Sequence, residues 1–309
     1  MDFLLHAVFA LLSVSSVARS QDASPAQLYW KAKLPNTPIP KAVRNFLPEA
    51  KSLTHGGENF FMASGGALQS RVFNYMHAAT EENLAAGKIA DVFFFHHQLK
   101  PGTKLRIQFL TATRKANFLP AELATTMPLT SKDLPQILTR LAIDPDTKAA
   151  ALMNETVSHC EAPSVSGETQ KCAASLEQLV DFSVGSLGGI SSQIEVKSTE
   201  VEQEDGSVQE YTIMEGVERV LGNKTVACHT KDFAYPVFIC HAATTRMVYS
   251  LPLAGADGRR VDAAVACHTN TAQWDPSNLA FQMLKVKPGG SDIICHFLPE
   301  DHIIWGTSD

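Results

Sequence analysis

The chain has 309 residues, of which 45% are hydrophobic and 19% are charged, and 26 Lys and Arg residues stand against 32 Asp and Glu residues. This composition excludes a disordered, collagen-like or coiled-coil protein. The net charge of −6, without a cluster of basic residues, argues against a nucleic-acid-binding protein. A chain of this length buries a sizeable core without covalent staples, so its six cysteines indicate either an oxidising compartment or a chemical role.

The N-terminus has the pattern of a secretory signal peptide, with an apolar run at residues 3–17 and small residues after it. The run is too short to span a bilayer comfortably, and no later stretch approaches about 18 uninterrupted apolar residues. The alternative is a buried N-terminal helix, because the residues before the apolar run include Asp2 and no Lys or Arg. We expect cleavage of residues 1–20 and a secreted protein without a membrane segment. Secretion makes two sequons usable as glycan acceptors, at Asn154 and Asn223.

The first half of the chain predicts a leader, a hairpin and three helices. Residues 21–60 hold five prolines and few periodic apolar positions, so we expect an extended leader. Aromatic and β-branched residues at 92–99, the turn signal Pro101-Gly102 and an alternating stretch at 105–110 predict a hairpin. Helices are predicted over 131–143, from 146 to 157, and from the capping-box residue Ser175 to the glycines at 185–189.

From residue 190 onward the patterns predict strands joined by tight turns. The turn signals are Asp205-Gly206, Asp257-Gly258 and Pro288-Gly289-Gly290. The paired segments are expected at 193–204 with 207–213, at 241–253 with 260–268, and at 279–286 with 292–298. The sequence therefore predicts an α+β fold, a single domain dominated by antiparallel β-sheet with a few helices in its N-terminal half.

The C-terminal third repeats the dipeptide Cys-His four times. The copies are Cys228-His229, Cys240-His241, Cys267-His268 and Cys295-His296. Each copy ends a short apolar run of the kind that forms strands. Successive side chains of a strand point to opposite faces, so four strands in similar register would place four imidazoles on one face and four thiols on the other.

The two faces predict different chemistry. Four convergent imidazoles suit Cu(II), Zn(II) or Ni(II), and the Irving–Williams order favours copper, so we expect copper to be bound by His229, His241, His268 and His296. Thiols of a secreted protein oxidise, so we expect disulfides on the other face. A mixed Cys/His zinc site is disfavoured because its usual clustered spacings are absent. The remaining alternative is that the histidines simply pack beside the disulfides.

Two cysteines lie outside this repeat. Cys160 and Cys172 are close together in the chain, and a disulfide between them is the most direct assignment. Six cysteines allow fifteen connectivities, so the pairing of the other four stays open.

Three further histidines are possible ligands by residue type. His96 and His97 are neighbours in the aromatic stretch, so only one of them can reach a common metal. His302 follows the last Cys-His pair and is expected in a loop after Pro299. None of the three belongs to the predicted set.

These residues resemble the BURP-domain family of secreted plant proteins. That domain has a Phe-Phe start, two cysteines, four Cys-His pairs at these spacings and a tryptophan near its end. Here these are Phe93-Phe94, Cys160, Cys172, the four pairs above and Trp305. The resemblance divides the chain into a signal peptide (1–20), an extended leader (21–84) and a BURP domain (85–307). The leader around residues 28–40 resembles that of seed-protein-like and dehydration-responsive members.

The resemblance implies a non-enzymatic protein of the apoplast or cell wall, of seed or stress type, with the histidine-based copper site; a seed-type member can also lie in the vacuole. One alternative is a copper-dependent autocatalytic peptide cyclase that crosslinks Trp or Tyr side chains. Repeated core peptides are absent, and only Tyr29-Trp30 faintly resembles one. Another alternative is a non-catalytic accessory of a pectin-degrading polygalacturonase. The implied partners are cell-wall polysaccharide or a wall enzyme, and no catalytic residue is assigned.

Overall fold

The computed structural model describes residues 23–47, 91–109, 116–164, 166–188, 191–201 and 208–307. The predicted signal peptide and the Asp205-Gly206 turn lie outside these ranges. The described residues form seven α-helices and thirteen strands, and the strands make two antiparallel sheets. This confirms the α+β fold dominated by antiparallel sheet. No helix in the described part of the chain combines the length and apolarity needed to cross a membrane.

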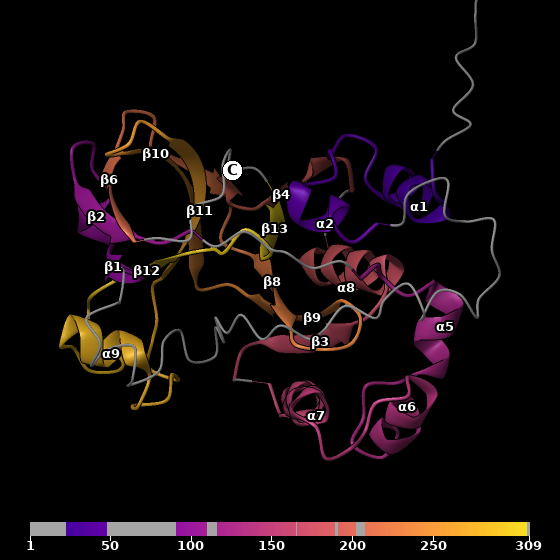
Figure 1. Cartoon of the computed structure of the whole chain (residues 1–309). Helices are drawn as coiled ribbons and strands as arrows, with labels where there is room; N and C mark the ends of the chain where they lie inside the picture. Colours follow the sequence, from indigo (N-terminus) through magenta and orange to yellow (C-terminus); the bar gives the residue numbers. More distant parts are fainter. Residues whose placement is uncertain are drawn as a thin grey trace, which may run out of the picture.

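The larger sheet curves into a barrel, seen at the left of Figure 1. Its main strands follow the order β1-β12-β11-β10-β6-β2. The two ends of this order approach each other, because Asp91 next to β1 exchanges hydrogen bonds with Arg106 in β2. The strands are β1 (Phe93–Phe95), β2 (Lys104–Ile107), β6 (Gln209–Ile213), β10 (Arg246–Gly255), β11 (Arg260–His268) and β12 (Ile294–Phe297), with β5 (Glu200–Val201) beside β11 and β7 (Glu218–Leu221) beside β10.

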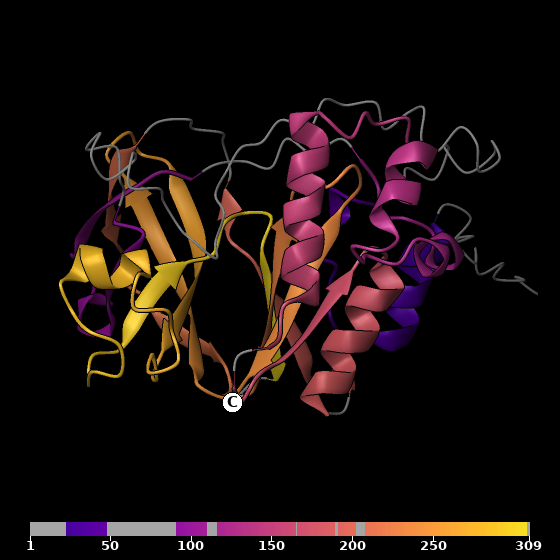
Figure 2. The same cartoon turned by 90° about the horizontal axis from the view of Figure 1, so that it is seen from below.

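The smaller sheet has the order β3-β9-β8-β13-β4 and stands between the barrel and a layer of helices (Figure 2). Its strands are β3 (Thr169–Ala173), β4 (Ile194–Lys197), β8 (Thr225–Lys231), β9 (Val237–Ala243) and β13 (Ile303–Thr307). The α-helices are α1 (Pro25–Lys33), α2 (Lys41–Arg44), α5 (Ala121–Thr126), α6 (Leu134–Arg140), α7 (Lys148–Glu161), α8 (Leu176–Leu187) and, against the barrel, α9 (Leu279–Leu284). Short 3-10 turns are η3 (His96–Gln98) and η4 (Ser191–Gln193).

The leader differs from the extended chain expected for it, because it contains α1 and α2. Ser24 and Gln27 form a capping box at the start of α1, with Pro25 in the first turn, where its missing N–H costs nothing. Trp30 is 1% exposed, and its ring lies 5.3 Å from that of Trp305 between centroids, tilted by 41°. Its indole N–H donates to the Thr37 carbonyl oxygen. The described part of the leader, residues 23–47, therefore contributes to the core that lies under the smaller sheet.

Several sequence-based elements are confirmed. The helices predicted over 131–143 and 146–157 are α6 and α7. The helix predicted from Ser175 is α8, and Gly188 ends it in the left-handed conformation at φ 62°. The Asp257-Gly258 hairpin is also confirmed, as β10 and β11, although β10 begins at Arg246 rather than at residue 241.

Three predicted hairpins are wrong. The stretch at 92–99 pairs with β12 and the one at 105–110 with β6, not with each other. Within 193–204, β4 pairs with β13 in the smaller sheet and β5 pairs with β11 in the larger one, whereas β6, within 207–213, pairs with β10 and β2. Residues 279–284 form α9 instead of a strand, because the side chain of Asn278 caps a helix there. Local turn residues mark a change of direction, while the pairing partner is selected by the distant chain that buries the same face.

Candidate metal centre

Each Cys-His dipeptide lies on a strand, and the four strands pair two by two. The register places Cys228 of β8 opposite Cys240 of β9, and Cys267 of β11 opposite Cys295 of β12. Both pairs are disulfides, with Cα–Cα distances of 4.0 and 3.9 Å. The third disulfide joins Cys160 of α7 to Cys172 of β3, so no cysteine is free. The expectation of disulfides is confirmed, and strand register supplies the connectivity that the sequence left open.

The cysteines and histidines of these strands point to opposite faces, as alternation requires. Cys228–Cys240 lies in the core beneath α8 and the leader, and Cys267–Cys295 lies in the core inside the barrel. The small apolar residues that share a face with the histidines, including Ala227 and Ala266, belong to one cluster made from both sheets. The four imidazoles therefore occupy the layer between the barrel and the smaller sheet.

Within this layer the histidines form two pairs. In the sheet pair, Nε2 of His229 lies 2.9 Å from Nε2 of His241. In the barrel pair, Nε2 of His268 lies 3.1 Å from Nε2 of His296. Burial lowers the pKa of both histidines in the barrel pair, and a charge on Arg246 or His241 would lower it further. Among the described residues, no group of three or more His, Cys, Asp or Glu is arranged to hold a metal ion, and the predicted ligands meet as pairs.

The outer nitrogens of the sheet pair contact polar side chains. Nδ1 of His241 lies 2.8 Å from a Glu168 carboxylate oxygen and 2.6 Å from an Arg246 nitrogen. Arg246 also donates to Glu168 at 2.8 Å, and this buried arginine comes from β10 of the barrel. Nδ1 of His229 lies 3.0 Å from Nδ1 of His302, in the segment just before β13. The ion pair between Arg246 and Glu168 thus links the barrel to the smaller sheet.

The barrel pair has a drier environment. Nδ1 of His296 lies 3.1 Å from the carbonyl oxygen of Phe297. The His268 ring meets Trp274 edge to face, with 4.7 Å between centroids, and the His296 ring meets Phe93 at 6.1 Å. Both imidazoles are buried, whereas the His241 side chain is 23% exposed.

Burial keeps these imidazoles neutral. It lowers the pKa of His229, His241 and His268, and it lowers the pKa of His296 to about 3. The hydrogen bond to Glu168 opposes this effect at His241. Burial also disfavours the Glu168 carboxylate, but the hydrogen bond to His241 and the charge of Arg246 outweigh it and leave the pKa of Glu168 below its ordinary value. Neutral imidazole is the form of histidine that binds metals.

The donor set fits a metal ion in two respects. Metal-binding histidines commonly turn one ring nitrogen to the metal and the other to a carboxylate or backbone carbonyl. His241 and His296 show this arrangement, with Nδ1 at Glu168 and at the Phe297 oxygen. Two imidazole nitrogens that share a metal at about 2.0 Å lie roughly 2.8–3.3 Å apart. The distances within both pairs, 2.9 and 3.1 Å, fall in this range and also suit an N–H···N hydrogen bond.

Three contributors to the layer were not in the predicted set: Glu168, Arg246 and His302. None belongs to a repeated motif, and His302 was recognised only as a loop histidine. Glu168 lies just before β3 and Arg246 opens β10, so their meeting depends on the packing of the two sheets. No pattern in the sequence marks such a contact.

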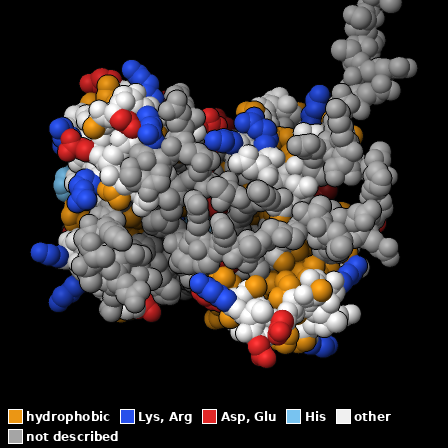
Figure 3. Space-filling model, viewed as in Figure 1, with side chains coloured by type: hydrophobic (Ala, Val, Ile, Leu, Met, Phe, Trp, Pro, Cys, Tyr) orange, Lys and Arg blue, Asp and Glu red, His pale blue; other side chains and the backbone are white. Residues whose placement is uncertain are grey.

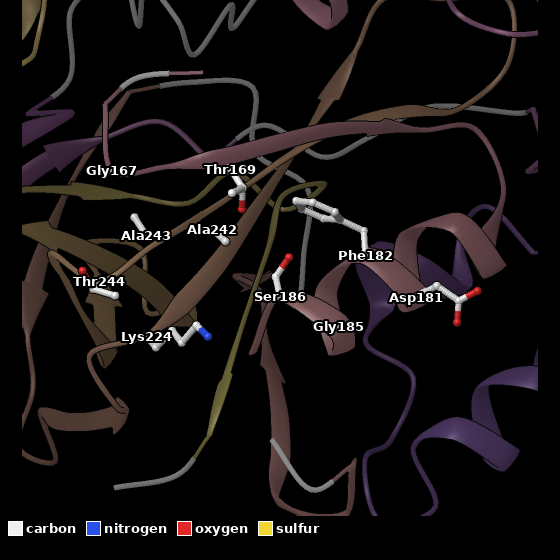
Figure 4. Close-up of a pocket in the computed structure, with 10 residues that line it drawn as sticks. All are labelled: Gly167, Thr169, Asp181, Phe182, Gly185, Ser186, Lys224, Ala242, Ala243 and Thr244. Carbon is white, nitrogen blue, oxygen red and sulfur yellow. The ribbon is translucent and has the colours of Figure 1, made fainter. Parts of the chain in front are cut away.

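The structure places other candidate positions away from the layer. The sequon residues Asn154, in α7, and Asn223, between β7 and β8, are both exposed. A pocket of about 580 Å³ lies on the opposite side of the smaller sheet, between α8 and the ends of β3 and β9 (Figure 4). Phe182, Ser186 and Lys224 are among its lining residues, and none of the four Cys-His histidines is.

Comparison with known proteins identifies the family. The BURP domain family model matches residues 92–307. The chain is 41% identical to rice BURP domain-containing protein 3 (Oryza sativa subsp. japonica) over 76% of this chain and 55% of that protein. It is 38% identical to BURP domain protein RD22 of Arabidopsis thaliana over 81% of this chain and 64% of that protein, and 30% identical to Protein RAFTIN 1B of wheat (Triticum aestivum) over 96% and 95%. It therefore spans less than two thirds of the length of the first two relatives. The chain belongs to the BURP domain family of plant proteins.

Proposed function

We propose that this BURP domain protein is a secreted protein of the plant apoplast or cell wall that binds copper through its two histidine pairs. The observation that carries the proposal is the meeting of His229 with His241 and of His268 with His296 in one buried layer, Nε2 to Nε2. Neutral imidazoles in a layer between two disulfide-locked strand pairs are suitable ligands for Cu(II). Secretion is supported by the signal-peptide pattern and by the three disulfides.

Each side chain around the pairs has a definable task in this proposal. The Nε2 atoms of each pair would hold copper, and bound copper would supply one-electron redox capacity. Glu168 and the Phe297 oxygen accept the Nδ1 protons, which leaves Nε2 of His241 and His296 as lone-pair donors. Arg246 balances the charge of Glu168 in a buried position. The disulfides hold the strand register and thereby the spacing within each pair.

The peptide-cyclase alternative receives no support from the leader. Crosslinking needs an accessible indole or phenol, and Trp30 is 1% exposed in the core. The Tyr29 hydroxyl donates to the Asp181 carboxylate. Tyr29 and Trp30 are therefore explained by packing, and we assign no catalytic residue. We expect mass spectrometry of copper- and oxygen-treated protein to find no loss of hydrogen pairs in peptides that contain Tyr29-Trp30.

Copper binding is tested by calorimetric titration of metal-stripped protein with Cu(II), with nitrogen hyperfine coupling in the EPR spectrum as a second readout. H229N/H241N and H268N/H296N each remove one pair, and H97Q, which replaces an exposed histidine outside the layer, is the control. If one ion is shared, both double variants lose the site; if each pair holds its own ion, each loses half of the stoichiometry. If a variant that lacks all four histidines binds copper as well as the wild type does, the proposal is overturned.

The outer contacts allow a finer test. E168Q keeps the shape of the side chain next to His241 but removes its charge. We expect roughly 10- to 100-fold weaker copper binding from this change, as for other partners of metal-bound histidines. E161Q, a replacement of an exposed glutamate at the end of α7, is the matched control and should bind like the wild type.

A further inference from the structure

A second cluster of chemically active side chains lies on the inner face of the barrel. Nε2 of His96, in η3, lies 2.7 Å from the hydroxyl oxygen of Tyr249, in β10, with 5.3 Å between the ring centroids. The same hydroxyl lies 3.7 Å from the sulfur of Met247. All three side chains are half-buried, and Met247 and Tyr249 pack against the barrel core.

We propose that Tyr249 is a redox-active tyrosine whose phenol proton is accepted by His96. A one-electron oxidant, such as a transition-metal ion in its higher oxidation state, removes one electron from the phenol. The O–H bond breaks and its proton passes to Nε2 of His96, which leaves a neutral tyrosyl radical and an imidazolium. The reverse transfer restores the pair when one electron returns.

The geometry of the pair is already that of the proton transfer. At 2.7 Å the phenol oxygen and the imidazole nitrogen share one hydrogen bond, so no side chain has to move first. Burial and the charge of His97 lower the pKa of His96, so its imidazole is neutral at neutral pH and can accept a proton. The Met247 sulfur, 3.7 Å from the hydroxyl, is a weaker acceptor for the same proton than the imidazole of His96.

The other described tyrosines have different surroundings. The hydroxyl of Tyr211 accepts a hydrogen bond from the Gln209 amide, and that of Tyr29 donates to a carboxylate. Tyr235 is buried, and burial raises the pKa of its phenol well above the ordinary value. Tyr211 packs in the same barrel core as Tyr249, which makes it a suitable control.

Strand register brings Tyr249 near the histidine layer. Tyr249 of β10 is opposite Val265 of β11, which is opposite Phe297 of β12, the residue after His296. With strands about 4.8 Å apart and about 3.3 Å per residue, the Cα atoms of Tyr249 and His296 are roughly 10 Å apart. The part of the inference that makes Tyr249 a donor of electrons to the layer rests on the proposed function, whereas the oxidation of Tyr249 itself does not.

The first test uses the metal-stripped full chain, oxidised by a photogenerated Ru(III) complex and frozen for EPR. We expect a tyrosyl signal that narrows when tyrosine is ring-deuterated, is lost in Y249F and is kept in Y211F. Y249F removes only the hydroxyl and preserves the packing of the ring. An unchanged signal in Y249F would overturn the proposal.

The role of His96 has its own readout. H96Q should slow formation of the radical by roughly 100-fold, the size of a typical general-base contribution, and should remove the slowing that D2O causes in the wild type. Added imidazole should restore the rate in H96G. Radical formation at the wild-type rate in H96Q, with the same solvent isotope effect, would exclude His96 as the proton acceptor.

The connection to the layer is tested after Cu(II) loading. A copper ion in the layer should accelerate the spin relaxation of the Tyr249 radical, and the H229N/H241N/H268N/H296N variant should lose this acceleration. A radical that forms without acceleration in protein that binds copper would refute the connection. If no copper binds, the proposed function fails while the result for the metal-free tyrosine stands.

Discussion

The two halves that face each other across the histidine layer bury their disulfides in different ways. In the barrel half, Cys267–Cys295 is enclosed mainly by strands of its own sheet. In the sheet half, Cys228–Cys240 is enclosed by α8 and by leader residues such as Trp30 and Phe46, more than 180 positions earlier in the chain. One half therefore closes its core with strands of its own sheet, two of them from residues 93–107, while the other also needs helices from outside its sheet.

The same contrast appears around the imidazoles. The barrel pair is surrounded by aromatic rings and a backbone carbonyl, whereas the sheet pair contacts Glu168, Arg246 and His302. Burial is the largest cause of the lowered pKa in both pairs, and at His241 the hydrogen bond to Glu168 opposes it. A similar dipeptide on similar strands thus acquires different properties from what packs around it.

Charged side chains of both signs are interspersed over the described surface of the barrel half in Figure 3.

The dependence of the sheet half on the leader predicts the largest effect. W30A should lower the free energy of unfolding by about 3–5 kcal/mol, the cost of a large aromatic cavity. Leu28, 51% exposed on the same helix, gives the matched control, because L28A should change stability by less than about 0.5 kcal/mol. Urea denaturation measures both. Equal effects of the two variants would show that the leader does not complete this core.

Removing the disulfides compares the halves directly. Cys267–Cys295 closes 28 residues and Cys228–Cys240 closes 12. Chain entropy then predicts a loss of about 3.6 kcal/mol for C267A/C295A and about 2.8 kcal/mol for C228A/C240A. C160A/C172A removes a disulfide with the same sequence separation of 12 but with half-buried cysteines. Its comparison with C228A/C240A shows how much of the loss comes from burial rather than from loop length. If thermal denaturation shows a larger loss of stability for C228A/C240A than for C267A/C295A, the entropic explanation is contradicted.

Acid should weaken the metal-free protein through its buried histidines, and His296 shows the effect. The pKa of His296 is about 3 in the fold and about 6.5 when unfolded, so unfolding takes up a proton as the pH falls between these values. This histidine stabilises the fold fully above pH 6.5 and should have lost about 2 kcal/mol of that contribution by pH 5. The free energy of unfolding should fall less between pH 7 and pH 5 in H296Q than in H241Q, because Glu168 opposes the pKa shift at His241. Urea unfolding at pH 7 and 5 gives the comparison.

The smallest effect is expected at the exposed edge of the leader. Asp181 accepts from Tyr29 and pairs with Lys33 at 3.2 Å, but the Asp181 side chain is 56% exposed. Solvent screens this interaction, so D181N should leave the urea midpoint almost unchanged. A shift as large as that of W30A would mean that polar contacts, rather than Trp30, dock the leader.

Much of the candidate site follows from local sequence. Alternation along strands separates Cys228 from His229, so the disulfide face and the histidine face could be predicted without a structure. The helices α6, α7 and α8 follow from apolar spacing and capping residues, which act within a few positions. The Asp257-Gly258 hairpin was predictable for the same reason.

Tertiary structure decided the rest. Trp30 lies in a proline-rich leader, and its burial follows from packing in a core that includes Trp305. Glu168, Arg246 and His302 reach the layer through the packing of two sheets, and β4 and β6 were expected in one hairpin yet lie in different sheets. The sequence by itself determined which residues share a face of a strand, because alternation is a local property of the chain. Which strands pair, and what surrounds each imidazole, depended on burying distant segments together, which no local pattern encodes.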